Sequence, residues 1–328
     1  MVVAVILSFF ISATSFLFAD EREIIKRASQ LAREKEYIKA LQLVEEGMAA
    51  SGKTEGLTNI QYRILLAAGR HEEALRVLDT IIAKTGDDPE VMIDKIRLLM
   101  DLERLDEALK IALEVEKNAE DKSPYMSFMI FQIYLSLNDK DKAYDWLERS
   151  VERGLNEYDY LLGDDFETLQ GDTRFEVIIS KIKDRIGIGK PAKDFTAPLL
   201  SQESYSLSQD RGKVVLLDFW ATWCPPCVAE IPKIKDLYET LHGDGFEIIG
   251  ISMDTERHVL ESFVKEEDVP WKIAFSGKSM EDETARLYGI TSIPKYFLID
   301  TKGILRFALD SGAEKLERAV KELLKEQE

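Results

Sequence analysis

Four similar helical segments recur in the first half of this chain at a nearly constant spacing. Each contains an alanine at the same position, and consecutive alanines are 34, 34 and 35 residues apart (Ala40, Ala74, Ala108 and Ala143). The residue four positions later lies on the same helical face and is apolar each time (Val44, Leu78, Ala112 and Leu147). Because a side chain as small as alanine lets two helices approach closely, this period predicts a stack of helical hairpins.

A third position completes the repeat. Nine residues before each alanine stands a large side chain that can pack the preceding helix against it (Leu31, Leu65, Leu99 and Tyr134). Over residues 21–153 the pattern resembles the tetratricopeptide repeat family, which implies an all-α solenoid with a concave surface for a protein partner. A spacer or a dimerisation arm is the alternative. Residues 154–186, which include the apolar run 175–182, are predicted to form a helix that covers the open face of the last repeat.

The net charge of the chain is −18, and both halves contribute to it. Residues 20–186 carry −11 and residues 187–328 carry −7. Nucleic acids and anionic membrane surfaces repel such a chain, so neither is expected as a partner.

Residues 2–19 form an uncharged apolar run that ends at Ala19, before acidic and helical sequence. This pattern predicts a secretory signal peptide or an uncleaved N-terminal anchor in residues 1–19. The rest of the chain is then expected to be exported, to the periplasm or elsewhere in the cell envelope. A buried first helix is the alternative.

A joint rich in Gly, Pro and Lys, residues 187–193, separates the repeats from a different pattern. Strands are predicted at 214–221, 246–253, 272–276, 296–300 and 304–309, the last two as an edge pair, and helices at 225–241, 256–267, 282–288 and 313–325. This alternation predicts a central sheet covered by helices on both sides. The chain is therefore expected to be multidomain, with an all-α domain over residues 20–186 and an α/β domain over residues 187–328.

The chain has two cysteines, and both lie in the Cys-Pro-Pro-Cys motif of residues 224–227. No other cysteine can form a structural disulfide, so the pair is a redox or a metal feature. Zinc would need two further ligands, and His242 and His258 have no ligand spacing to the pair. A c-type haem motif would need a histidine at Val228. No metal and no other cofactor is expected.

The predicted position of the motif, between a strand and a helix, explains its chemistry. A thiolate attacks a disulfide and a thiol does not, so the attacking cysteine needs a lowered pKa. Backbone N–H groups at the helix start stabilise negative charge on Cys224. Pro225 fits the first turn, where its missing N–H costs nothing, and Pro226 completes the spacer. Cys224 is predicted to be the exposed nucleophile and Cys227, one turn inward, the resolving thiol.

Two segments resemble thioredoxin. Residues 216–227 (LLDFWATWCPPC) are similar to its active-site segment, and the Thr-Ser-Ile-Pro sequence of residues 291–294 is similar to its cis-proline loop. The resemblance implies that Pro294 packs against the disulfide and that the backbone of Ile293 pairs with an extended partner chain. Pro232 is similar to the kink proline of the active-site helix.

Residues 187–328 resemble, more narrowly, the TlpA/ResA-like subfamily. Residues 191–195 with the following Pro198 are similar to its first strand, residues 269–288 to its inserted strand and helix, and Glu230 to an acid beside its active site. The resemblance implies reduction of disulfides in client proteins outside the cytoplasm, notably in apocytochrome c before haem attachment in cytochrome c maturation. It also implies a membrane thiol relay as electron donor.

Two acids compete for the proton-handling role. Asp218 interrupts an apolar strand and matches the buried acid of thioredoxin, so burial should raise its pKa and let it accept the proton of Cys227. A hydrogen-bonded structural acid is the alternative. Glu230 can also accept the proton, from a position nearer the surface. The alternative is that Glu230 is a solvated charge on the helix. Trp223 is interpreted as a shield over the disulfide on the substrate side, with plain packing as the alternative.

Three functions stay open. The first is an exported disulfide reductase whose repeats recruit or position its client. The second is an oxidant or isomerase on the same fold, since direction depends on the reduction potential. The third is a binding or assembly protein whose redox domain senses or docks. The paired motif argues against a peroxidase of the peroxiredoxin type, in which a lone cysteine reacts.

Overall fold

The computed structural model describes residues 21–326 except 53 and 87. Contacts divide the chain into two compact units, Met1–Arg153 and Gly154–Glu328. The predicted leader, residues 1–19, lies outside the described residues. Within the described ranges, no helix combines the length and the apolar character needed to cross a membrane.

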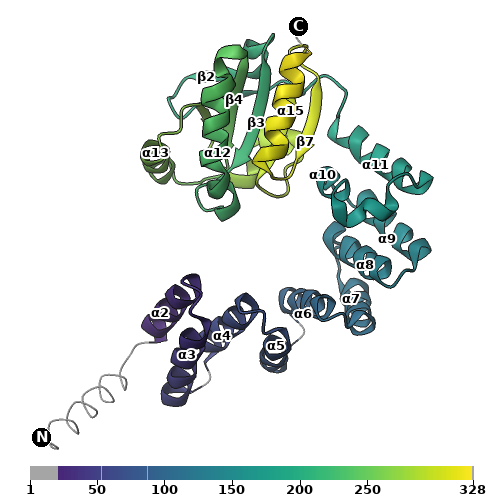
Figure 1. Ribbon diagram of the computed structural model, residues 1–328, viewed down its shortest axis with the longest axis vertical. Helices are drawn as coiled ribbons and strands as arrows, with labels where there is room; N and C mark the ends of the chain where they lie inside the picture. The colour runs from purple at the N-terminus through teal and green to yellow at the C-terminus, as the bar shows by residue number, and fades with distance from the viewer. Residues whose placement is uncertain (1–20, 53, 87, 327–328) are drawn as a thin grey trace, which may run out of the picture. The chain divides into compact units, whose positions relative to one another are not determined.

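The first unit consists of helices that pack in consecutive pairs (Figure 1). Their bounds are α2 (Glu21–Arg33), α3 (Tyr37–Ser51), α4 (Glu55–Ala67), α5 (His71–Thr85), α6 (Pro89–Asp101), α7 (Leu105–Asn118), α8 (Pro124–Ser136) and α9 (Lys140–Glu152). The side chains of Asp88 and Ser123 accept hydrogen bonds from the first backbone N–H groups of α6 and α8, and a proline follows each of them at the helix start. Capping residues and prolines therefore set where these helices begin.

The alanines of the repeat lie in the interior of the helical stack. All four are buried, and so are the apolar residues four positions later (Val44, Leu78, Ala112 and Leu147). At the third position of the repeat, Leu65 and Leu99 are buried, while Leu31 and Tyr134 are half-buried and pack against the same core. The predicted all-α repeat is confirmed. Interiors are close-packed, so a larger side chain in place of these alanines would separate the helices.

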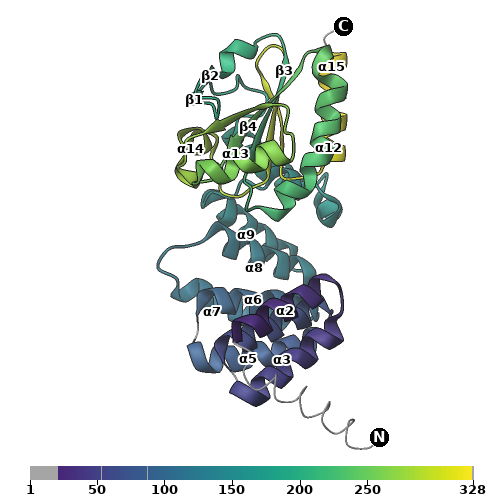
Figure 2. The same ribbon diagram turned by 90° about the vertical axis from the view of Figure 1, so that its left-hand side faces the viewer.

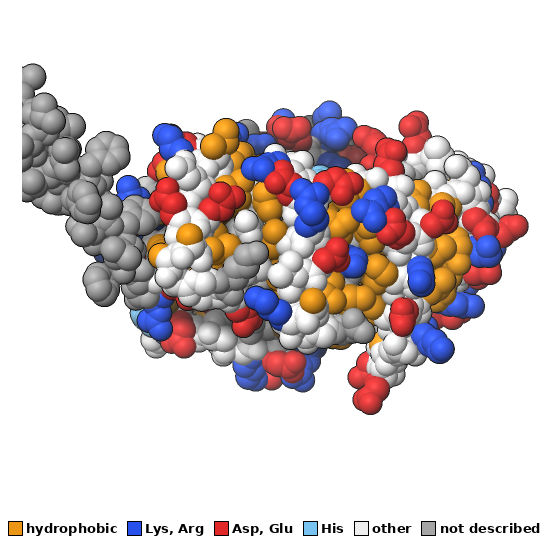
Figure 3. All heavy atoms as spheres, turned by 90° about the horizontal axis from the view of Figure 1, so that it is seen from below, with side chains coloured by type: hydrophobic (Ala, Val, Ile, Leu, Met, Phe, Trp, Pro, Cys, Tyr) orange, Lys and Arg blue, Asp and Glu red, His pale blue; other side chains and the backbone are white. Residues whose placement is uncertain are grey.

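Acidic and basic side chains are mixed over the face of the molecule seen in Figure 3, with hydrophobic side chains exposed between them. In the repeats, ion pairs recur at equivalent places, as Arg70 pairs with Glu73 and Arg104 with Glu107. Exposed pairs of this kind contribute little to stability.

The second unit is built on a five-stranded mixed sheet. Its strands are β3 (Val214–Trp220), β4 (Phe246–Ser252), β5 (Lys272–Phe275), β6 (Lys295–Ile299) and β7 (Leu305–Leu309), in the order β5-β4-β3-β6-β7. The first three run parallel, while β6 is antiparallel to both β3 and β7. Strands β3 and β4 are buried along their whole length, which explains their apolar sequences. The predicted last two strands do pair, with β7 at the edge and β6 one strand inside.

Helices cover the sheet on both sides, as predicted (Figures 1 and 2). On one side lie α12 (Pro225–Leu241) and α15 (Ala313–Lys325), with α13 (Arg257–Glu266) beside α12. The other side holds α14 (Glu283–Tyr288) and a small separate sheet of β1 (Thr196–Pro198) and β2 (Ser204–Ser206). The predicted first strand therefore begins at Thr196 rather than in residues 191–195, and it pairs with β2 outside the central sheet.

Residues 154–186 form α10 (Tyr158–Leu161), a 3-10 turn (Asp164–Leu169) and α11 (Thr173–Ile186). Their contacts group them with the second unit. Tyr158 and Ile186 pack against the core of the sheet domain, and α10 contacts β7. The unit boundary thus falls at Arg153, whereas the sequence predicted a boundary after residue 186, because this segment buries apolar side chains against the sheet domain.

Candidate redox site

The Cys-Pro-Pro-Cys motif lies where β3 leads into α12. Strand β3 ends at Trp220, and α12 begins at Pro225 with Cys224 as its capping residue. The two cysteines form a disulfide, and the backbone N–H of Cys227 points to Sγ of Cys224 at 3.3 Å. A backbone N–H at the start of a helix is a group that stabilises negative charge on a sulfur once the pair is reduced. The role of Cys224 as the attacking thiolate stays a prediction.

Exposure distinguishes the two sulfurs less than predicted. In the disulfide form Cys224 is 4% exposed and Cys227 is 2% exposed, so the expected exposed nucleophile is nearly covered. The neighbouring Trp223, by contrast, is 57% exposed. The indole of Trp223 is therefore not packed in the core, and its role beside the disulfide stays a prediction.

The predicted proline loop lies against the disulfide. The Ile293–Pro294 peptide bond is cis, and the carbonyl oxygen of Ile293 is 3.8 Å from Sγ of Cys224. Strand β6 begins immediately after this loop, at Lys295. The fold thus brings together two motifs that lie far apart in the sequence.

The prolines of the motif occupy the expected helical positions. Pro225 and Pro226 stand in the first turn of α12, and Pro232 lies inside the helix. A proline in the first turn removes only N–H groups that have no partner within the helix. Pro232 cannot donate a hydrogen bond to the carbonyl group of Val228.

Asp218 lies inside β3 and is 3% exposed. Its Oδ1 atom has no hydrogen-bond partner among the described residues. Burial, and next the negative charge of Glu230, raises the pKa of Asp218 to about 8. The proton-accepting role of Asp218 stays a prediction.

Glu230 is held by two hydrogen bonds. Its Oε2 atom accepts one from the hydroxyl group of Tyr296 at 2.6 Å, and its Oε1 atom accepts one from the backbone N–H of Gly312 at 2.8 Å. Glu230 is therefore not a freely solvated charge on the helix. The pairing register of β3 and β6 places Tyr296 opposite Asp218, so one tyrosine lies between the two acids.

Burial, the charge of Asp218 and the hydrogen bond to Glu230 all raise the pKa of Tyr296. The tyrosine stays protonated and acts as a donor. The sequence analysis missed it, although its place two residues after Pro294 in an apolar strand is a usable signal. Asp218, Tyr296 and Glu230 are called the acid cluster below.

Asp254 is a second residue that the sequence analysis missed. It follows β4, is 3% exposed, and accepts hydrogen bonds from the backbone N–H of Thr222 at 3.1 Å and from its hydroxyl group at 2.6 Å. The hydroxyl group of Ser252 donates a third, at 2.8 Å. Asp254 thereby fixes the turn that precedes Cys224. An acid directly after a buried strand was the available signal.

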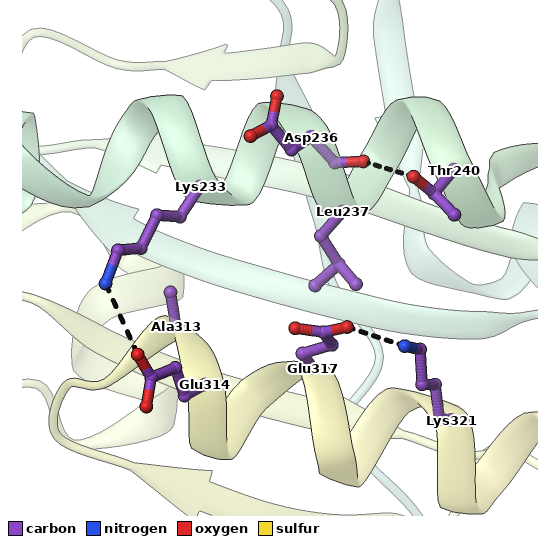
Figure 4. A pocket seen from close by; sticks show the side chains of 8 residues that line it. All are labelled: Lys233, Asp236, Leu237, Thr240, Ala313, Glu314, Glu317 and Lys321. Atoms are coloured by element: carbon purple, nitrogen blue, oxygen red, sulfur yellow. Dashed lines mark hydrogen bonds and ion pairs between the residues drawn. The ribbon is translucent and has the colours of Figure 1, made fainter.

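A groove of about 300 Å³ runs between α12 and α15, and Figure 4 shows its lining. Ion pairs join Lys233 to Glu314 at 3.7 Å and Lys321 to Glu317 at 2.6 Å. Neither cysteine lines this groove, which begins further along α12 than Glu230. The groove is a polar contact between two helices and does not belong to the redox site.

Comparisons with known proteins agree with this geometry. Residues 188–308 match the AhpC/TSA family, and residues 65–129 match the tetratricopeptide repeat. Thiol-disulfide oxidoreductase ResA of Bacillus cereus is 32% identical over 155 residues, which cover 47% of this chain and 87% of the relative. ResA of Oceanobacillus iheyensis is 34% identical over 148 residues, which cover 43% of this chain and 75% of the relative.

Among solved structures, a thiol:disulfide interchange protein DsbE from Chlorobium tepidum is 30% identical, covers 42% of this chain and 97% of its own, and has a TM-score of 0.39. The thioredoxin-like α/β domain carries a Cys-Pro-Pro-Cys disulfide, a cis-proline loop and a buried acid, and it aligns with most of the length of ResA relatives. The chain therefore belongs to the ResA-like family of thioredoxin-fold thiol–disulfide oxidoreductases, with tetratricopeptide-like repeats ahead of the redox domain.

Proposed function

We propose that this oxidoreductase works in the reductive direction and passes two electrons from the Cys224–Cys227 dithiol to disulfides of client proteins. The observation that supports this direction is the acid cluster, in which Asp218 and Glu230 share Tyr296. Glu230 stands one helical turn after Cys227 in α12, and its negative charge disfavours a thiolate nearby, which makes the reduced form less stable. Strong oxidants do the reverse and stabilise their reduced form. The cluster therefore favours a low reduction potential.

The reaction proceeds through a mixed disulfide. The Cys224 thiolate attacks one client sulfur, and the other client sulfur leaves as a thiolate. Cys227 then gives its proton to the carboxylate of Asp218 and attacks Sγ of Cys224, which releases the second client sulfur. The client gains two electrons and becomes a dithiol, and the pair becomes a disulfide. With a pKa of about 8, Asp218 can exchange protons with thiols, whose ordinary pKa is about 8.5.

The reduction potential tests the direction. The full chain is equilibrated with defined dithiothreitol or glutathione buffers, and the Cys224–Cys227 dithiol is quantified by alkylation. A value near −270 mV or lower, about that of thioredoxin, is expected for a reductase. A value near −120 mV, about that of strong protein oxidants, would contradict the reductive direction and indicate that the protein forms disulfides.

A protein client is proposed to lie along the cis-proline loop. The carbonyl group of Ile293 is next to the disulfide and the exposed side chain of Trp223 flanks it, so an extended chain can pair with the loop and contact the indole. In Cys227→Ser, a client should stay covalently attached to Cys224, because no thiol resolves the mixed disulfide. Cys224→Ser is the matched control and should trap none; equal trapping by both variants would contradict the assigned roles.

We also infer that the protein works outside the cytoplasm, with a membrane thiol relay as its electron donor and apocytochrome c among its clients. The apolar run of residues 2–19 and the family support this. Mass spectrometry of the mature N-terminus and labelling of Cys224 by a membrane-impermeant maleimide in intact cells test the location. Labelling only after lysis would rule it out.

The repeats are proposed to bind the client protein. A groove of about 260 Å³ between α3, α4 and α5 includes Gln61 and Arg76. Changing both to alanine should raise the KM for the physiological client and leave the reduction of insulin unchanged. If partner capture is instead unaffected by loss of both cysteines, and cells need only that capture, the protein acts as an assembly protein with a redox sensor.

A further inference from the structure

The segment that joins the repeats to the sheet domain is anchored beside the redox loops. This docking segment, residues 155–161, directly follows the last repeat helix and contains α10, which contacts strand β7 (Figure 1). Leu155 and Leu161 are buried at its two ends. The segment precedes residues 188–308, which match the AhpC/TSA family. It is therefore an addition to the redox domain that the family match does not cover.

One lysine connects the docking segment to the proline loop. Lys295 follows the cis-proline Pro294 directly, and its side chain is only 9% exposed. Its ammonium group pairs with Asp310 and lies 3.5 Å from the carbonyl oxygen of Asn156. A buried ammonium group needs such partners, because an unpaired charge in this position is costly. The position of the proline loop thus depends on a backbone group of the docking segment.

Asp310 makes the second connection. Its Oδ2 atom accepts a hydrogen bond from the backbone N–H of Tyr160 at 3.3 Å. Two residues further on, the N–H of Gly312 donates to Glu230 at 2.8 Å. The loop between β7 and α15 therefore binds the docking segment through Asp310 and binds Glu230 through Gly312.

We propose that Lys295 and Asp310 are positioning residues that transmit the docking of residues 155–161 to the Cys224–Cys227 pair. Through Lys295, docking of the segment sets the distance from the Ile293 carbonyl group to Cys224. Through Asp310 and Gly312, it sets the position of Glu230. The functional redox unit is then residues 154–328 rather than the part that matches the family.

This inference rests on the proposed function, in that Cys224 and Cys227 exchange disulfides. Lys295→Met removes the ammonium group and nearly keeps the shape of the side chain. Loss of this cation and of the docked loop should make the Cys224 thiolate less stable. We expect the pKa of Cys224 to rise by about half a unit, so that roughly threefold less thiolate is present at neutral pH. The matched control is Lys321→Met, which removes an equal charge from α15 away from the segment.

Two variants that leave the charge of the chain unchanged test the docking contact apart from the loss of the lysine's charge. Tyr160→Pro and Tyr160→Ala both lose the phenol, but only the proline also loses the N–H that binds Asp310. In Tyr160→Pro, hydrogen exchange over residues 155–161 should become faster, and the pH profile of Cys224 alkylation should shift. Tyr160→Ala should retain the wild-type profile. This pair decides the question even if Lys295→Met fails to fold.

The readouts are the pH dependence of alkylation of Cys224 in the full chain and the equilibrium constant with glutathione. A segment released in Tyr160→Pro, as seen by hydrogen exchange, with both readouts at wild-type values would overturn the inference. So would an equal shift in Tyr160→Pro and Tyr160→Ala. The proposed function fails separately, if the wild-type chain itself does not exchange disulfides or has the potential of an oxidant.

Discussion

The hydroxyl group of Tyr296 donates a 2.6 Å hydrogen bond to Oε2 of Glu230 and so joins strand β6 to the active-site helix α12. The same tyrosine stands opposite Asp218 in the register of β3 and β6. One buried phenol therefore lies next to both acids, and it ties the active-site helix to the strand that follows the proline loop.

Replacing Tyr296 by phenylalanine should destabilise the domain and alter the redox pair. The carboxylate of Glu230 loses the hydrogen bond that the tyrosine hydroxyl group donates, which costs about 2 kcal/mol of unfolding free energy. The pH profile of Cys224 alkylation should also shift, because the carboxylate is no longer held in place. Urea unfolding and alkylation rates measure the two effects. Tyr288→Phe is the control: it removes a 2.7 Å hydrogen bond to the carbonyl group of Lys193, away from the acids, and should leave the pH profile unchanged.

Asp218 should make stability depend on pH. The folded chain keeps the Asp218 proton up to about pH 8, whereas the unfolded chain loses it near pH 4. The folded state thus binds more protons between these values, so the unfolding free energy should fall as pH rises, by up to about 1.4 kcal/mol per pH unit.

Asp218→Asn has no proton to lose and should flatten this dependence, so the variant becomes more stable than wild type towards pH 8. It should also resolve mixed disulfides more slowly, because Cys227 loses its proton acceptor. Urea unfolding of the oxidised proteins at several pH values checks the first effect. The exposed Asp236→Asn on α12 should follow the wild-type curve. Parallel curves for Asp218→Asn and wild type would show that the buried carboxyl does not titrate as described.

Asp254→Ala should loosen the turn before Cys224. Three hydrogen bonds from the half-buried Thr222 and the buried Ser252 lose their acceptor, which costs about 3 kcal/mol of unfolding free energy. Reduction of insulin should slow as well. Thr222→Val keeps the backbone donor and should cost less. Asp244→Ala, at an exposed turn, is the control, and an equal loss there would show that the effect is not local.

Ala108→Leu should destabilise the repeats without changing the reduction potential. Ala108 is fully buried between packed helices, so the added atoms force a helix shift that costs about 1–3 kcal/mol. Thermal unfolding followed by helical circular dichroism measures the loss. Ala50→Leu adds the same atoms at an exposed position of α3 and should be nearly neutral. A wild-type melting temperature in Ala108→Leu would contradict close packing at the repeat alanines.

Much of this protein can be predicted from its sequence because the relevant signals are local. A 34-residue period of small and apolar residues locates α2 to α9, and Pro89 and Pro124 mark two of their starts. Apolar runs and turn residues place the strands of the central sheet and the helices α12 to α15 to within a residue or two. The Cys-Pro-Pro-Cys motif and the Ile293–Pro294 loop identify the redox centre before any contact is known.

Tertiary structure alone decided which groups surround that centre. Tyr296 meets Asp218 and Glu230 only because β6 pairs antiparallel with β3 in one particular register and α12 crosses that face. Residues 154–186 have apolar side chains that could be buried against either neighbour, so hydrophobic periodicity cannot assign them to a unit. The contact of Asn156 with Lys295 and that of Tyr160 with Asp310 assign the segment to the second unit. Local sequence determined the elements and the reactive sulfurs, whereas long-range packing decided the acids, hydrogen bonds and docking contacts that tune them.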